Sequence, residues 1–227
     1  MQFKPRETLT EQVAQHIENM IVFGQLKSGQ RIYEGPMAKE LDVSHGSVRE
    51  ALLLLEKRHL VRSTPRKGTF VTELDEHFVR SLYEAMQLYL THTDIKLLRH
   101  WTPDYMEHLE SLYEAMNDCY RRGQLMEFLN IGMEYAQCSI TYADNYFIVS
   151  ALLDLWPSAK RCAFVALRQG PAVIESNLRH MRRSLDTLKA RDEAALARIT
   201  DEYAKEQCEQ VLNSLAKQRP SPGQASG

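Results

Sequence analysis

The chain has 227 residues, of which 44% are hydrophobic, 26% charged and 8% aromatic. This composition excludes disordered, collagen-like and disulfide-stapled proteins. The 28 basic and 30 acidic side chains nearly balance, so the total charge argues against a protein that coats polyanions but says nothing about a local basic patch.

The cysteines and the first residues of the chain favour a cytoplasmic protein. Cys119, Cys138, Cys162 and Cys208 form no C-x-x-C pair, which favours reduced, buried thiols. The N-terminal residues lack the apolar core of a signal peptide, and no uncharged apolar run approaches the roughly 20 residues that span a bilayer. We therefore expect a cytoplasmic protein without a membrane segment.

The first part of the chain has the pattern of a winged helix-turn-helix. A capping box begins a helix at Thr8, short helical patterns follow, and alternation typical of strands is confined to residues 60–72. A Pro-Arg-Lys-Gly sequence should turn the two strands into a ribbon. The expected elements are helices over 8–24, 34–41 and 45–57 and strands over 60–63 and 69–72.

From Asp75 onward the residue pattern is helical with short breaks. The expected fold is therefore mainly α, with the winged helix-turn-helix followed by an antiparallel bundle of about six helices. The domains are expected at 1–74, 75–217 and, as a flexible tail, 218–227. The bundle helices should begin near 76, 103, 125, 146, 171 and 193, the third should reach about Ala143, and Pro157 should kink the fourth.

Three residues in the helix-turn-helix segment meet its steric needs. Two helices that cross steeply need a small residue at their contact, here Ala38, with Val48 at the packing position of the second helix. The turn between them requires a residue that tolerates positive φ, and Asp42 can do so.

The second of these helices has the features of a DNA-recognition helix. Ser44 should cap its N-terminus, which directs free N–H groups toward a phosphate. His45, Ser47 and Arg49 then lie on its first exposed turns, and Arg49 is the expected base reader because a guanidinium can bond guanine O6 and N7 together.

A local basic patch follows this helix. Residues 56–69 contain five basic side chains and one acidic side chain. The cations near the ribbon tip could reach a phosphate or the minor groove, and Gly68 permits the turn. The expected DNA-binding residues are Ser44, His45, Ser47, Arg49, Arg62, Arg66, Lys67, Gly68 and Thr69.

The segment RIYEGPMAKELDVSHGSVREALLLLEKRHLVRSTPRKGTFV resembles the winged helix of GntR-family bacterial transcription regulators, over about residues 8–74. The helical remainder is similar to the effector-binding (FCD-type) domain of the FadR-like branch, and Asp144-Asn145 resembles the Gly-Asn that closes one of its helices. The resemblance implies symmetric homodimers on palindromic double-stranded DNA operators, and a small metabolite, often a carboxylate, that controls DNA binding. Ser44-His45-Gly46-Ser47 departs from the common Ser-Arg-Thr-Pro, so we expect an operator sequence that differs from the family's commonest one.

The metal site of many FadR-like members has lost its ligands here. If Asn145 matches the family's Asn, the ligand positions fall on Gly132, Ala136, Met181 and Tyr203. None is the Asp or His that the family uses, so the resemblance implies a pocket without metal or other cofactor. His180 is next to one of these positions, but the ~100° rotation between neighbouring helical residues turns it elsewhere, and we expect it at the surface.

An effector in the bundle would then need cations or hydroxyl groups as partners. A carboxylate would use them directly, whereas small Gly132 and Ala136 could instead open an apolar cavity for an acyl chain. The sequence contains no catalytic motif, so we do not expect an enzyme. The alternative function is a helical interaction or architectural module without a metabolite response. The candidate ligand-binding residues are Tyr135, Tyr142, Arg161, Arg168, His180 and Tyr203.

Overall fold

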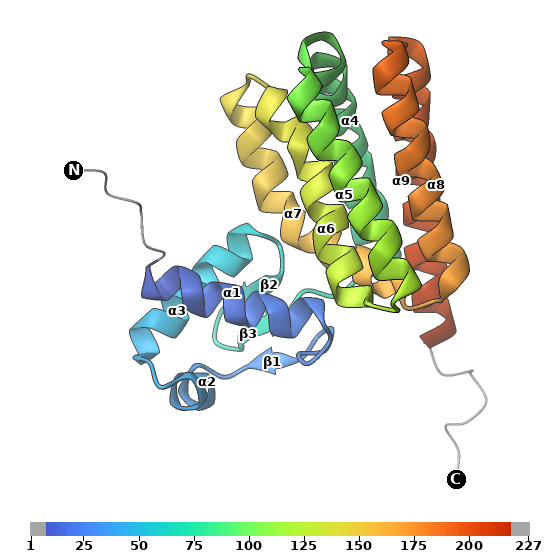
Figure 1. Cartoon of the computed structure of the whole chain (residues 1–227). Helices are drawn as coiled ribbons and strands as arrows, with labels where there is room; N and C mark the ends of the chain where they lie inside the picture. Colours follow the sequence, from blue (N-terminus) through green and yellow to red (C-terminus); the bar gives the residue numbers. More distant parts are fainter. Residues whose placement is uncertain (1–7, 219–227) are drawn as a thin grey trace. The chain divides into compact units, whose positions relative to one another are not determined.

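The computed structural model describes residues 8–218 and is mainly α-helical with one small sheet (Figure 1), which confirms the expected fold class. It divides into two compact units. The first contains the described residues up to Leu74 together with Leu153–Arg161, and the second contains Asp75–Leu152 and the described residues from Cys162 onward. The sequence analysis expected one boundary, between residues 74 and 75, and so did not predict that Leu153–Arg161 belongs to the first unit. Except for residue 218, the expected tail lies outside the described residues.

The first unit is a winged helix-turn-helix. Its helix-turn-helix occupies the middle of this part of the chain, and the ribbon follows it directly. The elements are α1 (Leu9–Val22), β1 (Arg31–Ile32), α2 (Glu34–Leu41), α3 (His45–Lys57), β2 (Val61–Thr64) and β3 (Gly68–Val71).

The sheet has three antiparallel strands in the order β1-β3-β2. The sequence pattern misses β1, because two residues are too few to show an alternation and the strand exists through its pairing with β3. Both ribbon strands also lie one residue away from the expected ranges. Thr64 pairs with Gly68, so the ribbon closes more tightly than the pattern implies.

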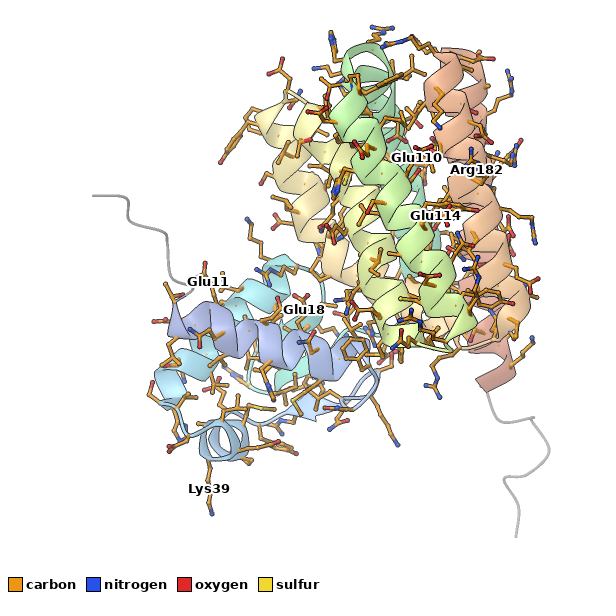
Figure 2. The ribbon with its side chains drawn as sticks, viewed as in Figure 1. Glu11, Glu18, Lys39, Glu110, Glu114 and Arg182 are labelled. Carbon is orange, nitrogen blue, oxygen red and sulfur yellow. The ribbon has the colours of Figure 1, made fainter. Side chains whose placement is uncertain are left out.

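Helix α1 begins with the expected capping box. The Thr8 hydroxyl accepts from Glu11 N at 3.2 Å, and the Glu11 carboxylate accepts from Thr8 N at 2.7 Å. Hydrogen bonds from the Thr8 backbone and hydroxyl lower the pKa of Glu11. Farther along α1, the nearly buried Glu18 (Figure 2) pairs with Arg58 at 3.0 Å, which ties α1 to the end of α3.

The turn between α2 and α3 has the expected geometry. Asp42 ends α2 in the left-handed region with φ 53 and ψ 48, and Val43 N donates to Ala38 O at 3.0 Å. Ala38 and Val48 are both buried in the core of this unit. The small residue, the left-handed turn residue and the packing residue therefore lie as a close helix crossing requires.

The second unit is built from helices that pack along one another. Helix α4 packs against α9, α5 packs against α6 and α8, and α8 lies beside α9 (Figure 1). The expected six helices are confirmed within the described residues. The third ends at Gln137 instead of near Ala143, and a 3₁₀ helix follows it. The elements are α4 (Glu76–His100), α5 (Pro103–Arg121), α6 (Leu125–Gln137), η1 (Cys138–Tyr142), α7 (Tyr146–Leu167), α8 (Pro171–Ala190) and α9 (Glu193–Gln218).

Local capping explains where these helices begin. Asp75 and Thr102 accept hydrogen bonds from backbone N–H groups three residues ahead, and Pro103 occupies the first turn of α5. Asn145 caps α7 by accepting from two backbone N–H groups. Asp144 before it has φ 44, a conformation that suits Gly, which the family resemblance has at this place.

Two glycines of the first unit should respond oppositely to replacement by alanine. Gly68 has φ +100 and an added Cβ would lie 3.0 Å from Arg31 Nε, so Gly68→Ala should lower the free energy of unfolding by about 1–3 kcal/mol. Gly46 lies in α3 and its Cβ would meet only Ser44 Oγ at 3.6 Å, so Gly46→Ala should raise it by about 0.5–1 kcal/mol. Urea denaturation of both variants measures this, and a shift of the same sign in both would contradict the argument.

Candidate DNA-binding and ligand-binding sites

The N-terminus of α3 is capped as expected. Ser44 has extended backbone angles, and its Oγ accepts from Ser47 N at 3.0 Å and lies 2.9 Å from Ser47 Oγ. Ser44 and His45 are exposed, whereas Ser47 is partly buried. The remaining N–H groups of the first turn therefore open toward solvent next to polar side chains, as an anion-binding helix end requires.

Arg49 lies on the exposed face of α3. Its side chain is 72% exposed, and Nη2 lies 3.3 Å from Glu34 Oε2 on α2. A carboxylate from the preceding helix therefore orients the guanidinium while most of it faces solvent. This arrangement leaves the guanidinium accessible to a base edge.

The tip of the ribbon is a tight turn with exposed cations. Lys67 N donates to Thr64 O at 3.0 Å, and Arg66 takes a left-handed φ of 62. Arg66, Lys67 and Gly68 are all exposed. The turn thus projects two positive charges from the end of the ribbon.

Arg62 and Thr69 have partners within the protein. Arg62 Nη2 lies 3.4 Å from Glu73 Oε1, and both side chains are 60% exposed. Thr69 is partly buried, and its Oγ1 lies 3.4 Å from Ser63 Oγ across the ribbon. Contact with DNA would have to compete with these weak, solvent-exposed interactions.

The structure adds two cations that the sequence analysis left out. Arg31 on β1 lies beside Gly68 of the ribbon, and its guanidinium stacks on the exposed Tyr33 ring at 4.8 Å. Lys39 extends away from α2 into solvent (Figure 2). Recognition of β1 would have indicated Arg31, because the pairing with β3 brings it next to the ribbon.

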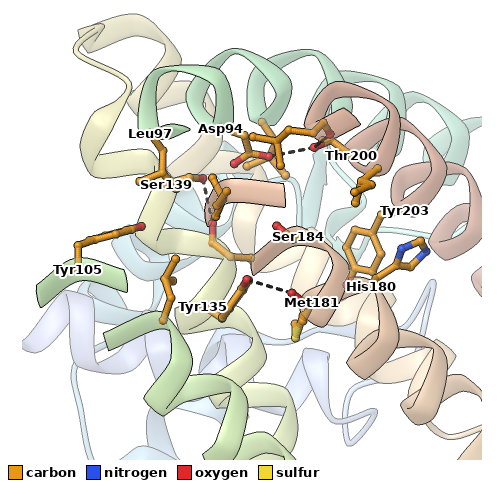
Figure 3. A pocket seen from close by; sticks show the side chains of 16 residues that line it. Asp94, Leu97, Tyr105, Tyr135, Ser139, His180, Met181, Ser184, Thr200 and Tyr203 are labelled. Atoms are coloured by element: carbon orange, nitrogen blue, oxygen red, sulfur yellow. Dashed lines mark hydrogen bonds between the residues drawn. The ribbon is translucent and has the colours of Figure 1, made fainter. Parts of the chain in front are cut away.

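The second unit has a partly open cavity of about 100 Å³. Residues from α4, α5, α6, η1, α8 and α9 line it, and most of its wall is apolar (Figure 3). Its polar side chains come from three tyrosines, two serines, one threonine, one histidine and one aspartate. They are Asp94, Tyr105, Tyr135, His180, Tyr203, Ser139, Ser184 and Thr200.

Three of the six expected ligand-binding residues line this cavity, namely Tyr135, His180 and Tyr203. The Tyr135 hydroxyl donates to Met181 O at 3.4 Å, and the Tyr203 hydroxyl donates to Asn177 Oδ1 at 2.8 Å. Burial raises the pKa of both phenols well above the usual value. They therefore remain neutral hydroxyl groups.

The other three expected residues lie outside the cavity wall. Tyr142 packs edge-on against Tyr105, with ring centroids 4.9 Å apart. Arg168 is exposed at the end of α7. Arg161 belongs to the first unit, where its guanidinium donates to Thr72 O at 2.7 Å. A mid-helix position does not tell which helix face turns inward, so the sequence could not indicate which of the six residues would line this cavity.

His180 is buried, so its expected place at the surface was wrong. It is 7% exposed, and Nε2 lies 2.8 Å from Glu206 Oε2. Burial alone would raise the pKa of Glu206, but hydrogen bonds from Ser176 and His180 lower it. The neighbouring Arg179, Arg182 and Arg183 belong to the outer face of α8, which misled the sequence argument.

Asp94 is the acidic residue among the cavity residues that the sequence analysis missed. Its Oδ2 accepts from Thr200 Oγ1 at 3.1 Å. Burial raises the pKa of Asp94 to about 6, although hydrogen bonds with Ser139 and Thr200 act in the opposite direction. A signal existed, because Asp94 follows Leu90 by four residues and precedes Leu97 by three, which puts a carboxylate on the apolar stripe of α4.

The four positions at which the family resemblance implies metal ligands lie close together in the fold. Ala136, Met181 and Tyr203 line the cavity, and a Cβ on Gly132 would lie 3.7 Å from Met181 Cε. These side chains do not fit a metal ion, because they offer at most a thioether and a phenol. Among residues 8–218, no cluster of three His, Cys, Asp or Glu side chains could hold one.

The winged helix and the helical unit after it are the architecture of a DNA-binding regulator. Residues 9–71 match the model of the bacterial regulatory proteins of the gntR family, and residues 96–206 match the FCD domain. The chain belongs to the GntR family and carries an FCD domain.

Two relatives match most of the chain. The HTH-type transcriptional regulator McbR of Escherichia coli is 25% identical over 193 residues, which cover 82% of this chain and 84% of McbR. The uncharacterized HTH-type transcriptional regulator YdhC of Bacillus subtilis is 23% identical over 207 residues, which cover 88% of this chain and 89% of YdhC. The families and relatives are transcription regulators, and the chain is not an enzyme.

Solved structures share the fold. Escherichia coli McbR/YncC has a TM-score of 0.79 at 18% identity, with 92% of this chain and 100% of that chain covered. A GntR-type regulator from Rhodococcus sp. RHA1 has a TM-score of 0.71 at 18% identity, with 90% of this chain and 97% of that chain covered.

None of the helices in residues 8–218 combines the length and apolar character that a membrane crossing requires.

Asp94→Asn should make the protein more stable at neutral pH. Because the folded state raises this pKa to about 6, wild-type stability should fall as the pH rises from about 4 to about 6 and stay low above it. The variant has no carboxylate to titrate, so its free energy of unfolding at pH 7.5 should exceed that of the wild type by about 3 kcal/mol. At pH 4 the two free energies should differ much less. Denaturant titrations at both pH values measure the difference.

Asp186→Asn is the matched control, because this exposed aspartate on α8 pairs with Arg182 away from the cavity. It should retain the wild-type fall in stability between pH 4 and 6. A stability difference for Asp94→Asn that is the same at pH 4 and pH 7.5 would contradict the assignment.

The purified protein should contain no stoichiometric metal. The residues at the four family ligand positions offer no His or carboxylate, so zinc or nickel has no site to occupy there. Elemental analysis of protein purified without chelator measures this. Zinc or nickel retained at one equivalent per chain would overturn the argument.

Proposed function

We propose that this GntR-family regulator is a homodimer that reads a palindromic operator through residues 1–74 and changes its operator affinity when a small metabolite occupies the helical domain. The observation that carries the proposal is the capped, solvent-facing N-terminus of α3 with Arg49 beside it and the cationic ribbon tip in the same unit.

The proposed DNA contacts divide into two kinds. Ser44, His45, Ser47 and the α3 N-terminus meet phosphate or base edges in the major groove, and Arg49 reads a guanine. Arg62, Arg66, Lys67, Gly68 and Thr69 carry the wing contacts to phosphate or the adjacent minor groove. A bidentate arginine contact contributes roughly 1–3 kcal/mol of discrimination, whereas the wing supplies affinity for all sequences.

The dimer and the effector rest on the family and on the cavity. GntR regulators bind DNA operators, and two copies of a winged helix on a palindrome would have half-sites roughly 34 Å apart. The FCD domain supports a small-molecule effector, and the cavity lined by Asp94, Tyr135 and Tyr203 offers it a place. A regulator of chromosomal genes acts in the cytoplasm of a bacterial cell.

Selection of genomic DNA fragments on the purified full chain tests the proposal. Enrichment of a palindromic sequence, with an affinity that changes when candidate metabolites are added, is the expected result. Binding without sequence preference and without a metabolite effect would instead support a helical interaction or architectural module.

Arg49→Ala and Lys67→Ala should affect DNA binding differently. Arg49→Ala should weaken operator binding by roughly 5- to 150-fold while random DNA loses much less, because only the operator presents the guanine. Lys67→Ala should weaken binding to both alike and reduce the slope of log affinity against log salt by about one. Fluorescence anisotropy with both duplexes measures the affinities, and equal losses on both for Arg49→Ala would refute base reading.

A further inference from the structure

The polar chemistry of the cavity differs from that of a carboxylate site. Among its described lining residues there is no Lys or Arg, and its one acidic side chain is Asp94. Thr200 Oγ1 donates to this carboxylate at 3.1 Å, and Ser139 supplies a second hydroxyl partner. Two hydroxyl groups compensate a desolvated carboxylate only in part, so the wall of the cavity favours a positive charge.

Aromatic rings surround the same space. Tyr105 from α5, Tyr135 from α6 and Tyr203 from α9 line the cavity together with Asp94 (Figure 3). Burial raises the pKa of all three phenols, so the rings bring no negative charge of their own. Tyrosine faces attract cations, and rings around an acidic group are a known way to bind ammonium groups.

His180 adds a buried polar atom without a partner among the described residues. Nε2 of His180 lies 2.8 Å from the Glu206 carboxylate, which requires a proton on Nε2. Nδ1 is buried and has no hydrogen-bond partner among the described residues. This nitrogen is therefore available to a polar group of a ligand.

The volume limits the size of the ligand. The cavity has about 100 Å³, whereas a dry protein cavity of about 150 Å³ holds benzene. Leucine and isoleucine side chains form much of the remaining wall, at Leu90, Leu97, Leu109, Leu196 and Ile199. A ligand of about five non-hydrogen atoms with an alkyl part fits this space, and a long acyl chain would extend beyond it.

We propose that the cavity binds a short primary alkylammonium ion, with its ammonium group on Asp94 among the tyrosine rings and its alkyl part against the leucines. This inference rests on the proposed effector role of the cavity and gives the effector a charge opposite to that of a carboxylate. A carboxylate ligand would bring a like charge next to Asp94 without a basic partner.

Matched four-carbon ligands test the charge directly. Isothermal titration of the full chain at pH 7.5 with butylammonium, butyrate and 1-butanol compares a cation, an anion and a neutral molecule of similar size. Butylammonium should bind, 1-butanol should bind at least tenfold more weakly, and butyrate should not bind. Butyrate binding as tightly as butylammonium, or no binding of butylammonium, would overturn the proposal.

Two variants and one control locate the site. Asp94→Asn should weaken butylammonium binding at least tenfold and bring it close to that of 1-butanol, whereas Asp186→Asn on the outer face of α8 should not change it. Ala136→Leu should fill the cavity and weaken both ligands, which tests the location without altering charge. Unchanged butylammonium affinity in Asp94→Asn would refute the proposed contact.

Operator binding measured in parallel separates the two proposals. A change in operator affinity with butylammonium supports both the ligand class and the regulatory role. Butylammonium binding that leaves operator affinity unchanged supports the ligand class but contradicts the effector role of the cavity. Regulation by butyrate alone would leave the proposed function intact and overturn the ligand class.

Discussion

Asp42 takes a left-handed conformation, with φ 53 and ψ 48, between the two helices of the helix-turn-helix. Asp42 ends α2, and a single residue, Val43, separates it from Ser44. The Ser44 hydroxyl caps the N-terminus of α3. The buried Ala38 allows the two helices to approach closely, and Val48 fills the space from the other side. The direction of the α3 N-terminus, and with it the position of Arg49, depends on this short turn.

Local signals account for the parts of the fold that the sequence predicts well. Helix starts at Thr8, Ser44 and Asn145 depend on side-chain hydrogen bonds to nearby N–H groups, which a few consecutive residues determine. The apolar faces of α1 and α3 follow in the same way from helical spacing. The residues of the recognition helix and wing could therefore be named in advance, although their contact with DNA remains a proposal.

Features that depend on distant partners were harder to predict. Strand β1 exists through pairing with β3, about 40 residues later in the chain, and its two residues show no pattern of their own. The cavity draws residues from several helices, so Tyr135, His180 and Tyr203 could be named as candidates but not assembled. Asp94 was missed although its spacing from Leu90 and Leu97 gave a signal, because charged residues on helices usually face solvent.

The ion pair between Glu34 and Arg49 affects how the protein meets DNA of any sequence. Glu34 lies 3.3 Å from the guanidinium before DNA arrives, and the phosphates of every duplex repel this carboxylate. In the proposed complex a guanine contact takes the place of the Glu34 ion pair, because the guanidinium cannot hold both partners in the same way. On a sequence without that guanine the pair stays formed, so Glu34 neutralises a charge that would otherwise attract DNA of any sequence.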